Sequence, residues 1–324
     1  MSLLKNRRFA TFAWGVLGYN ILVVLWGAYT RATGSGAGCG SHWPLCNGEV
    51  VPRDPQIETI IEFAHRTTSA LAGVLVIILV VWAWRAFPKG HLVRRGSVLS
   101  LIFIIVEGLV GASLVRYEWV AGNDSVARAV IMAVHLVNTF ILLGVITMTA
   151  WWASTLDAGD TQPRSYWRRD DRRSWLIGAA LLFIVVVSAA GAVTALGDTL
   201  FPAGSLSEGV ARDFSPTAHF LERLRVWHPV LAVLSALYIF AMLGQLGNTK
   251  PGSNTRRFSR AVQLLVVTQI AAGAVNLILL APIAMQLVHL LLADMVWISL
   301  VLLAATTLEE TELVPVHERA PATA

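Results

Sequence analysis

The chain has 324 residues, of which 56% are hydrophobic and 14% are charged. An ordinary soluble domain carries roughly a quarter of charged residues, so the composition excludes that class and predicts an integral membrane protein. The net charge of +5 does not indicate a nucleic-acid partner, because in a membrane protein the placement of positive charges matters more than their sum.

Apolar stretches predict eight transmembrane helices. A membrane-spanning helix needs about 20 residues, and six stretches without Asp, Glu, Lys or Arg reach or approach this length. They are Phe9–Thr30, Thr67–Trp84, Ala129–Leu156, Ser174–Gly197, Val226–Thr249 and Ala261–Ala293. The last stretch breaks at Pro282 and continues to Leu308, so it supplies two helices. The stretch from Gly96 to Val115 is interrupted by Glu107 alone and supplies the eighth helix.

The positive charges predict the orientation in the membrane. With the N-terminus inside, the cytoplasmic segments hold seventeen of the 25 Lys and Arg residues, and the outer segments hold the other eight. Positive charge favours the cytoplasmic side, so we expect a protein of the cell membrane with both termini in the cytoplasm. The first apolar stretch is longer than the core of a signal peptide and lacks a clear cleavage site, so we expect a retained helix.

The two halves of the chain resemble each other. The segment GAYT at Gly27 recurs as GAVT at Gly191, and EGLVGA at Glu107 recurs as QIAAGA at Gln269. Four helices per repeat preserve the orientation, so an axis along the membrane normal should relate the halves. The predicted fold is all-α, with two tandem, pseudo-symmetric four-helix bundles. The expected boundaries are 1–156 for the N-terminal half, 157–308 for the C-terminal half and 309–324 for a disordered tail.

Four of the eight histidines carry the predicted chemistry. His65, His135, His228 and His289 fall one in each even-numbered helix, roughly 9 to 14 Å from its outer end at the rise per residue of an α-helix. Intramembrane histidines usually face a partner or a cavity, and two imidazoles on facing helices can ligate a six-coordinate haem iron. We therefore expect one haem between His65 and His135 and another between His228 and His289. A structural hydrogen-bonding role and a proton relay are the alternatives.

A carboxylate near these histidines distinguishes the two halves. Glu62 precedes His65 by three residues and shares its helix face, whereas Arg225 takes that place before His228. Glu62 is therefore a candidate acid/base beside the N-terminal metal site. Alternatively, Glu62 has no chemical role and its negative charge only interacts favourably with the helix dipole in the first turn of the helix.

Further intramembrane residues have structural interpretations. We expect a structural hydrogen bond for Glu107. Asp294 is either a partner of His289 or satisfied by a neighbouring helix. Glycines such as Gly108 and Gly111 permit close helix packing.

Cys39 and Cys46 lie in the predicted outer loop between the first two helices. The outer compartment is oxidising and the intervening residues can close a small loop, so we expect a disulfide. It is either a structural staple or a redox-active pair that exchanges electrons with a partner. Zinc is disfavoured, because two cysteines and His42 are an incomplete ligand set.

Three motifs accompany the histidines of the later helices: TRATGSGAGC at 30–39, WPLCNG at 43–48 and EFAHR at 62–66. Together they resemble the haem A synthase family of cytochrome oxidase assembly enzymes, over about residues 9–308. The resemblance implies that haem O is the substrate. Its C8 methyl group would be oxidised by two successive hydroxylations to a formyl group, which gives haem A.

The resemblance also implies residue roles and partners. His65 and His135 would ligate the substrate haem, His228 and His289 a haem b that relays electrons, Glu62 would be the essential carboxylate, and Cys39 and Cys46 the outer-loop disulfide. A haem O synthase and a membrane or outer electron acceptor are the implied partners, and the oligomeric state stays open. The main alternative is a di-haem cytochrome b that carries electrons between a quinone and an outer partner. A thiol oxidase acting through the cysteine pair is the third.

Overall fold

Helices form the regular secondary structure of this protein. The computed structural model describes residues 2–156, 171–248 and 251–312. The predicted cytoplasmic charges at 164, 168, 169, 250 and 319 and most of the predicted disordered tail lie outside these residues. The helices, including one short 3-10 turn, are α1 (Ser2–Ala32), η1 (Ser35–Ala37), α2 (Ile57–Ala86), α3 (Leu92–Arg116), α4 (Val126–Thr155), α5 (Arg172–Leu200), α6 (Leu206–Asp213), α7 (Phe220–Leu224), α8 (Trp227–Gly247), α9 (Ser253–Ile278) and α10 (Ile283–Glu312).

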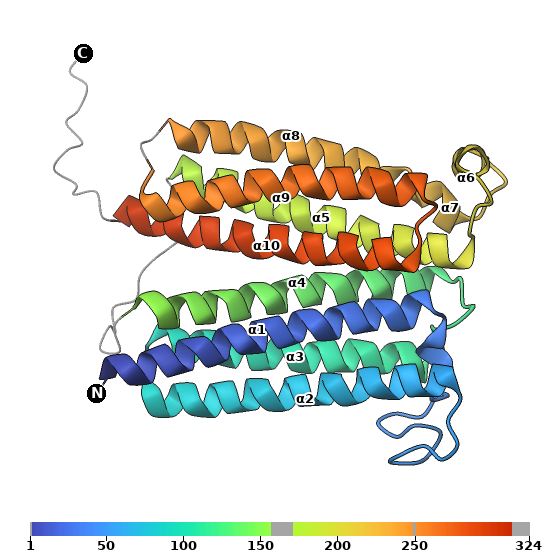
Figure 1. Ribbon diagram of the computed structural model, residues 1–324, viewed down its shortest axis with the longest axis horizontal. Coiled ribbons are helices and arrows are strands. Elements are labelled where there is room, and N and C mark those ends of the chain that lie inside the picture. The colour runs from blue at the N-terminus through green and yellow to red at the C-terminus, as the bar shows by residue number, and fades with distance from the viewer. Residues whose placement is uncertain (1, 157–170, 249–250, 313–324) are drawn as a thin grey trace.

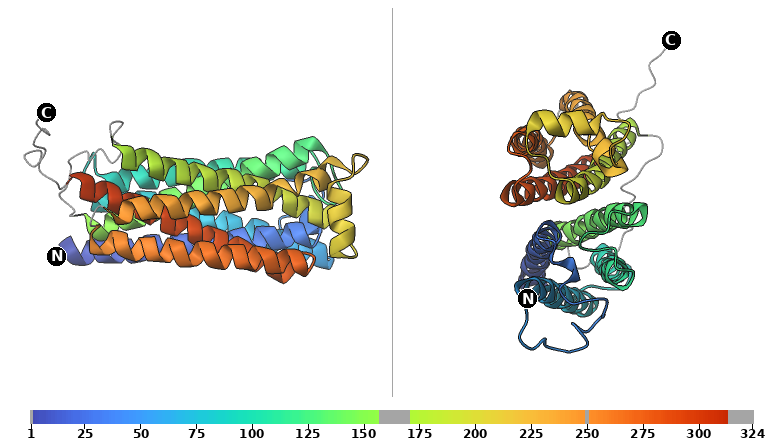
Figure 2. Two further views of the ribbon diagram at one scale, coloured as in Figure 1. Left: turned by 90° about the horizontal axis from the view of Figure 1, so that it is seen from above. Right: turned by 90° about the vertical axis from the view of Figure 1, so that its right-hand side faces the viewer.

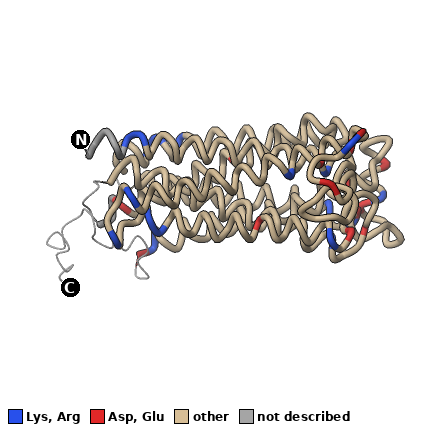
Figure 3. The backbone as a smooth tube through the Cα atoms, turned by 90° about the horizontal axis from the view of Figure 1, so that it is seen from below, with Lys and Arg blue, Asp and Glu red and all other residues tan. Residues whose placement is uncertain are grey.

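The described part of the chain has eight helices long and apolar enough to cross a membrane, with α7 and α8 together counted as the sixth. The predicted number is confirmed. The long helices run alongside one another in Figure 1, and the charged residues gather mostly at the two ends of the molecule in Figure 3. An apolar chain of this kind is helical because a helix satisfies its own backbone hydrogen bonds where no water is available.

The helices form two groups of four. Helices α1 to α4 make one group, and α5, α8, α9 and α10 make the other, as the right-hand view of Figure 2 shows. This arrangement is compatible with the predicted tandem bundles. Helices α1 and α4 of the first group pack against α5 and α10 of the second, so the halves share a packed boundary.

Trp297 of α10 fits against α4 at this boundary. Its indole Nε1 donates a hydrogen bond of 2.6 Å to the carbonyl oxygen of Phe140, and the two ring centroids are 5.4 Å apart. One turn further along α4, a Cβ at Gly144 would lie only 3.2 Å from the same Nε1. The indole packs closely against α4 because Gly144 carries no side chain.

The helix boundaries follow the prediction in part. Helix α2 begins at Ile57, about 12 Å before His65 at the rise per residue of an α-helix, as predicted. It extends beyond the charge-free stretch to include the ion pair of Glu62 and Arg66. The sixth span is interrupted between α7 and α8, so His228 is the second residue of α8. Helix α6 was not predicted. Charge-free stretches mark the apolar middle of a span, not the turns that extend beyond it.

Candidate functional site

Each predicted ligand histidine faces a glycine on a neighbouring helix. From an ideal Cβ on the glycine to the nearest ring atom, the pairs are Gly27 with His65 (2.8 Å), Gly111 with His135 (3.9 Å), Gly191 with His228 (2.9 Å) and Gly273 with His289 (2.9 Å). At three of the four positions a side chain would collide with the imidazole, so only glycine allows the ring to lie there. The arrangement recurs in both halves, as the internal sequence repeat predicts.

His228 and His289 face each other in the C-terminal half. Their ring centroids are 6.2 Å apart and their planes are at 89°. Nδ1 of His228 lies 3.1 Å from the carbonyl oxygen of Val187. The carbonyl can only accept, so Nδ1 carries the proton and the lone pair of Nε2 is left for a metal. A metal–imidazole bond is about 2 Å long, so the separation of the rings leaves room for one ion between them.

His135 in the N-terminal half lies beside a carboxylate. Its Nδ1 is 3.2 Å from Oε1 of Glu107. Glu107 also accepts hydrogen bonds from Asn138 Nδ2, at 2.5 Å, and from the hydroxyl of Thr139. The expected structural hydrogen bond of Glu107 is therefore confirmed, and the same carboxylate also faces a predicted ligand. The contact between Glu107 and His135 is an ion pair, since Nδ1 of His135, like Nδ1 of His65, makes no hydrogen bond among the described residues. His65 has no such carboxylate partner in the described part of the chain.

The donor set suits haem iron. Among the described residues, no group of three or more His, Cys, Asp or Glu side chains could hold a metal ion, whereas a structural zinc ion takes four protein ligands. A porphyrin supplies four nitrogens of its own, so two facing imidazoles complete the coordination of its iron. Glycines that bring the helices close to the rings fit this group. So do the buried Nδ1 atoms of His65, His135 and His289, which make no hydrogen bond among the described residues.

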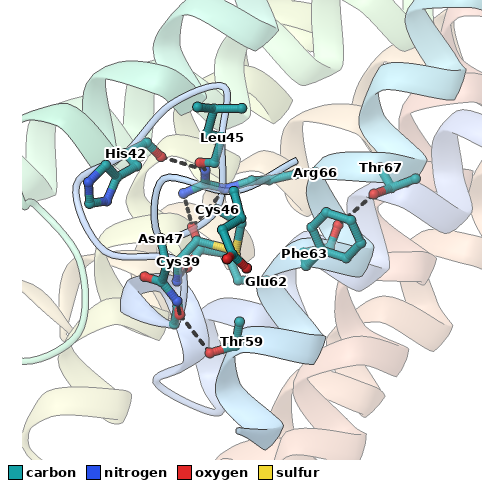
Figure 4. The surroundings of a disulfide bond; sticks show 12 residues. Cys39, His42, Leu45, Cys46, Asn47, Thr59, Glu62, Phe63, Arg66 and Thr67 are labelled. Carbon is teal, nitrogen blue, oxygen red and sulfur yellow. Dashed lines mark hydrogen bonds and ion pairs between the residues drawn. A yellow bond between two sulfur atoms is a disulfide. The ribbon is translucent and has the colours of Figure 1, made fainter. Parts of the chain in front are cut away.

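The disulfide loop folds over the first turns of α2 (Figure 4). Cys39 and Cys46 are joined by a disulfide with an S–S distance of 2.00 Å, which confirms the predicted bond. Oε2 of Glu62 accepts the backbone N–H of Cys39 at 2.7 Å, and Oε1 pairs with Arg66 Nη2 at 2.5 Å. Among the described residues, none of the hydrogen bonds of Glu62 reaches His65. The structure therefore places Glu62 against the loop, one helical turn from the histidine.

Two side chains that the sequence analysis missed anchor the same loop. Nη1 of Arg66 donates to the carbonyl oxygens of His42 and Leu45, at 2.6 and 2.7 Å. The hydroxyl of Thr59 donates to the carbonyl oxygen of Gly38 at 2.7 Å. Arg66 stands next to His65 in the EFAHR motif, which was the available signal. The loop is thus bound to α2 at three separate points along its length.

Other predictions for the membrane interior have mixed outcomes. Asp294 is fully buried, and neither of its carboxylate oxygens has a hydrogen-bond partner among the described residues. The interpretations that it bonds to His289 or to a neighbouring helix are therefore wrong. Gln269 lies 3.3 Å, Nε2 to Nε2, from His289; it contacts a histidine of its half, but at Nε2, whereas Glu107 contacts Nδ1 of His135. Gly111, interpreted as a packing glycine, has the ring of His135 as its neighbour.

Comparison with known proteins shows the family of the chain. The family model described as cytochrome oxidase assembly protein matches residues 10–301. The chain belongs to this family. A haem A synthase of an Exiguobacterium species is 28% identical to this assembly protein over 270 residues, which are 83% of each chain. A haem A synthase of Halalkalibacterium halodurans is 47% identical over 97 residues, 30% of this chain and 33% of the relative.

A further relative of the assembly protein is longer. A protohaem IX farnesyltransferase of Thermus thermophilus is 50% identical over 306 residues, which are 93% of this chain and 49% of the relative. The chain therefore spans about half the length of the curated relatives it matches first. Family membership and eight apolar helices together make this assembly protein a multi-pass membrane protein.

Proposed function

We propose that this assembly protein is a haem A synthase, which oxidises the C8 methyl group of haem O to a formyl group. The observation that carries the proposal is the pair of facing histidines in the C-terminal half, at 6.2 Å between ring centroids, together with the matching histidine–glycine contacts of the N-terminal half. Two relatives named haem A synthase support it.

The two halves would have different tasks. His65 and His135 would hold the substrate, haem O, and His228 and His289 would hold a haem b. A bound haem b would supply one-electron transfer. The presence of Glu107 beside His135, where the other half has Gln269, supports this division.

Glu62 is the proposed acid/base of the N-terminal half. Its side chain is almost fully buried, and Arg66 and the N–H of Cys39 fix the orientation of its carboxylate. It lies one turn before His65, on the same side of α2. From this place its carboxylate would accept protons that are released as the methyl group is oxidised.

The proposed partners follow from the substrate. A haem O synthase would supply haem O, and the protohaem IX farnesyltransferase with half its length similar to this chain supports such a partner. Electrons would leave to a membrane or outer acceptor. The proposed location is the cell membrane, with both termini in the cytoplasm.

Substitution of the carboxylate tests the proposal. Glu62→Gln keeps the volume of the side chain and an oxygen that can accept from Cys39 N–H, but it removes the acid/base. We expect the fold and haem b to persist and haem A formation to fall by about 10²-fold, which is typical of losing a positioned acid/base. The measurement is the ratio of haem A to haem O in membranes that also contain a haem O source.

Thr59→Val is the matched control for loop anchoring. It removes the hydrogen bond from Thr59 to Gly38 and leaves Glu62 unchanged, so haem A should still form. An equal loss of haem A in both variants would assign Glu62 to anchoring the loop. Undiminished haem A in Glu62→Gln would overturn the acid/base role of Glu62, and absence of haem A with the wild-type protein would favour the di-haem electron carrier.

A further inference from the structure

A haem iron held by both His65 and His135 has no free position, so one ligand has to leave before a small molecule can bind. We propose that His135 is the retained ligand and His65 the one that leaves, with Glu107 as the positioning residue that makes the difference. This inference rests on the proposed function. The helical positions of the two histidines are equivalent, and the contacts behind their rings are not.

The contact behind His135 is a held carboxylate. Oε1 of Glu107 lies 3.2 Å from Nδ1 of the ring, which leaves Nε2 for iron. Asn138 and Thr139 lie on α4, one turn after His135. They donate hydrogen bonds to the two carboxylate oxygens of Glu107 and keep the carboxylate in place. A carboxylate behind a ligand histidine fixes the ring and makes it a stronger donor to the metal.

The ring of His65 has no such support. Nδ1 of neither His65 nor His135 makes a hydrogen bond among the described residues. Of the two, His135 has a carboxylate oxygen within ion-pair distance of its Nδ1, that of Glu107, and His65 has none in the described part of the chain. The close neighbour of His65 is Gly27, which has no side chain to hold the ring. Rotation of the His65 ring would therefore break its bond to iron alone, whereas rotation of the His135 ring would also separate its Nδ1 from the carboxylate of Glu107.

The direction of opening agrees with the proposed acid/base. His65 and Glu62 lie one turn apart on α2, whereas His135 and Glu107 lie on α4 and α3. Departure of His65 would open the face of the haem that is turned toward α2. A small molecule bound there would be on the side of Glu62 and of the disulfide loop.

The C-terminal half shows a different support for its histidines. His228 is oriented by the neutral carbonyl of Val187. The neutral amide of Gln269 lies beside Nε2 of His289, and Nδ1 of His289 makes no hydrogen bond among the described residues. A carboxylate therefore lies next to Nδ1 of a predicted ligand in the N-terminal half, at His135. The contacts of His228 and His289 are with neutral groups.

The test compares His65→Ala with His135→Ala in the full-length protein, purified from cells that make haem O. We expect His65→Ala to keep haem O and to bind carbon monoxide in its ferrous form, with a shifted Soret band. We expect His135→Ala to keep at least 10-fold less haem O. The haem b signal of the C-terminal half reports in each sample that the protein is folded.

Glu107→Gln, in the His65→Ala background, tests the positioning residue. Loss of the charge should raise the stretching frequency of bound carbon monoxide, because the opposite histidine donates less to iron. It should also speed the transfer of haem O to apomyoglobin by about 10- to 100-fold, as is typical when a residue behind a metal ligand is lost. Glu58→Gln, at an exposed position of α2, is the control and should change neither quantity.

The outcomes separate this inference from the proposed function. The inference alone would be overturned if His135→Ala kept haem O and bound carbon monoxide. It would also be overturned if the two histidine variants behaved equally. An unchanged stretching frequency in Glu107→Gln would overturn the role of Glu107. A wild-type protein that binds no haem O would overturn the proposed function and the inference with it.

Discussion

The four intramembrane histidines of this protein each lie opposite a glycine, and the missing side chain leaves room for the imidazole ring. His228 and His289 lie against Gly191 and Gly273, where a Cβ would come within 2.9 Å of a ring atom. In a membrane, helices associate without a hydrophobic driving force between them, and small residues let their backbones approach. Here the same small residues accept an imidazole instead of a second backbone.

A methyl group at Gly191 should therefore displace its histidine. Gly191→Ala puts a Cβ at 2.9 Å from Cε1 and 3.3 Å from Nδ1 of His228, so the ring has to move away from its place opposite His289. We expect the low-spin haem b spectrum to be shifted or lost, as in His228→Ala. The measurement is the visible spectrum with the haem content of the purified protein.

Gly244→Ala is the control for this substitution. A Cβ at this position of α8 would have nothing within 4 Å, so the spectrum should be normal. A normal spectrum in Gly191→Ala as well would contradict the role of the glycine.

At the scale of elements, α2 and the loop before it behave as one unit. Thr59, Glu62 and Arg66 follow one another along α2 at roughly one-turn spacing, and each bonds to the loop. Cys39 and Cys46 are 0% and 1% exposed, so a redox partner could not reach the sulfur atoms without movement of the loop. This burial favours the structural staple over the redox-active pair.

Labelling of the two cysteines tests both the disulfide and the topology. A membrane-impermeant thiol reagent should label neither cysteine until the bond is reduced, because the intact disulfide has no thiol. After reduction, labelling should occur from the extracytoplasmic side only, as the distribution of positive charges predicts. Labelling before reduction would contradict the disulfide, and labelling from the cytoplasmic side would reverse the orientation.

At the scale of the whole molecule, an arginine links the two halves where α1 ends. Three hydrogen bonds connect Arg31 to the second half, with acceptors Ala195 O at 2.7 Å, Thr199 Oγ1 at 2.6 Å and Gln286 Oε1 at 2.7 Å. Trp297 joins the halves further along α10. The boundary is therefore held by directional bonds as well as by packing.

Arg31→Ala should weaken this boundary. A hydrogen bond that involves a charged group contributes about 1.5–3 kcal/mol, so loss of the side chain should lower the temperature at which the detergent-solubilised protein unfolds. Circular dichroism during heating measures the change. Arg53→Ala removes a largely exposed arginine with one surface ion pair and should leave that temperature unchanged. Equal shifts in the two variants would contradict a linking role for Arg31.

The sequence by itself determined the membrane class, the number of spanning helices, the disulfide and the family. These follow from local rules: a bilayer demands a fixed length of apolar helix, and cysteines close in sequence on the oxidising side form a short loop. The start of α2 before His65 also followed from the sequence, whereas helix α6 and the break between α7 and α8 did not. The haem ligand roles of the histidines remain predictions.

Only the tertiary structure decided which groups face one another across helices. Helical spacing relates Glu62 to His65 on one helix, but the partner of Glu62 is the N–H of Cys39, brought there by the folded loop. In the same way, nothing in the sequence pairs Glu107 of α3 with His135 of α4. The helical period predicts which residues share a face of one helix. Hydrogen bonds between helices depend on how each helix is rotated about its axis and shifted along it when the helices pack.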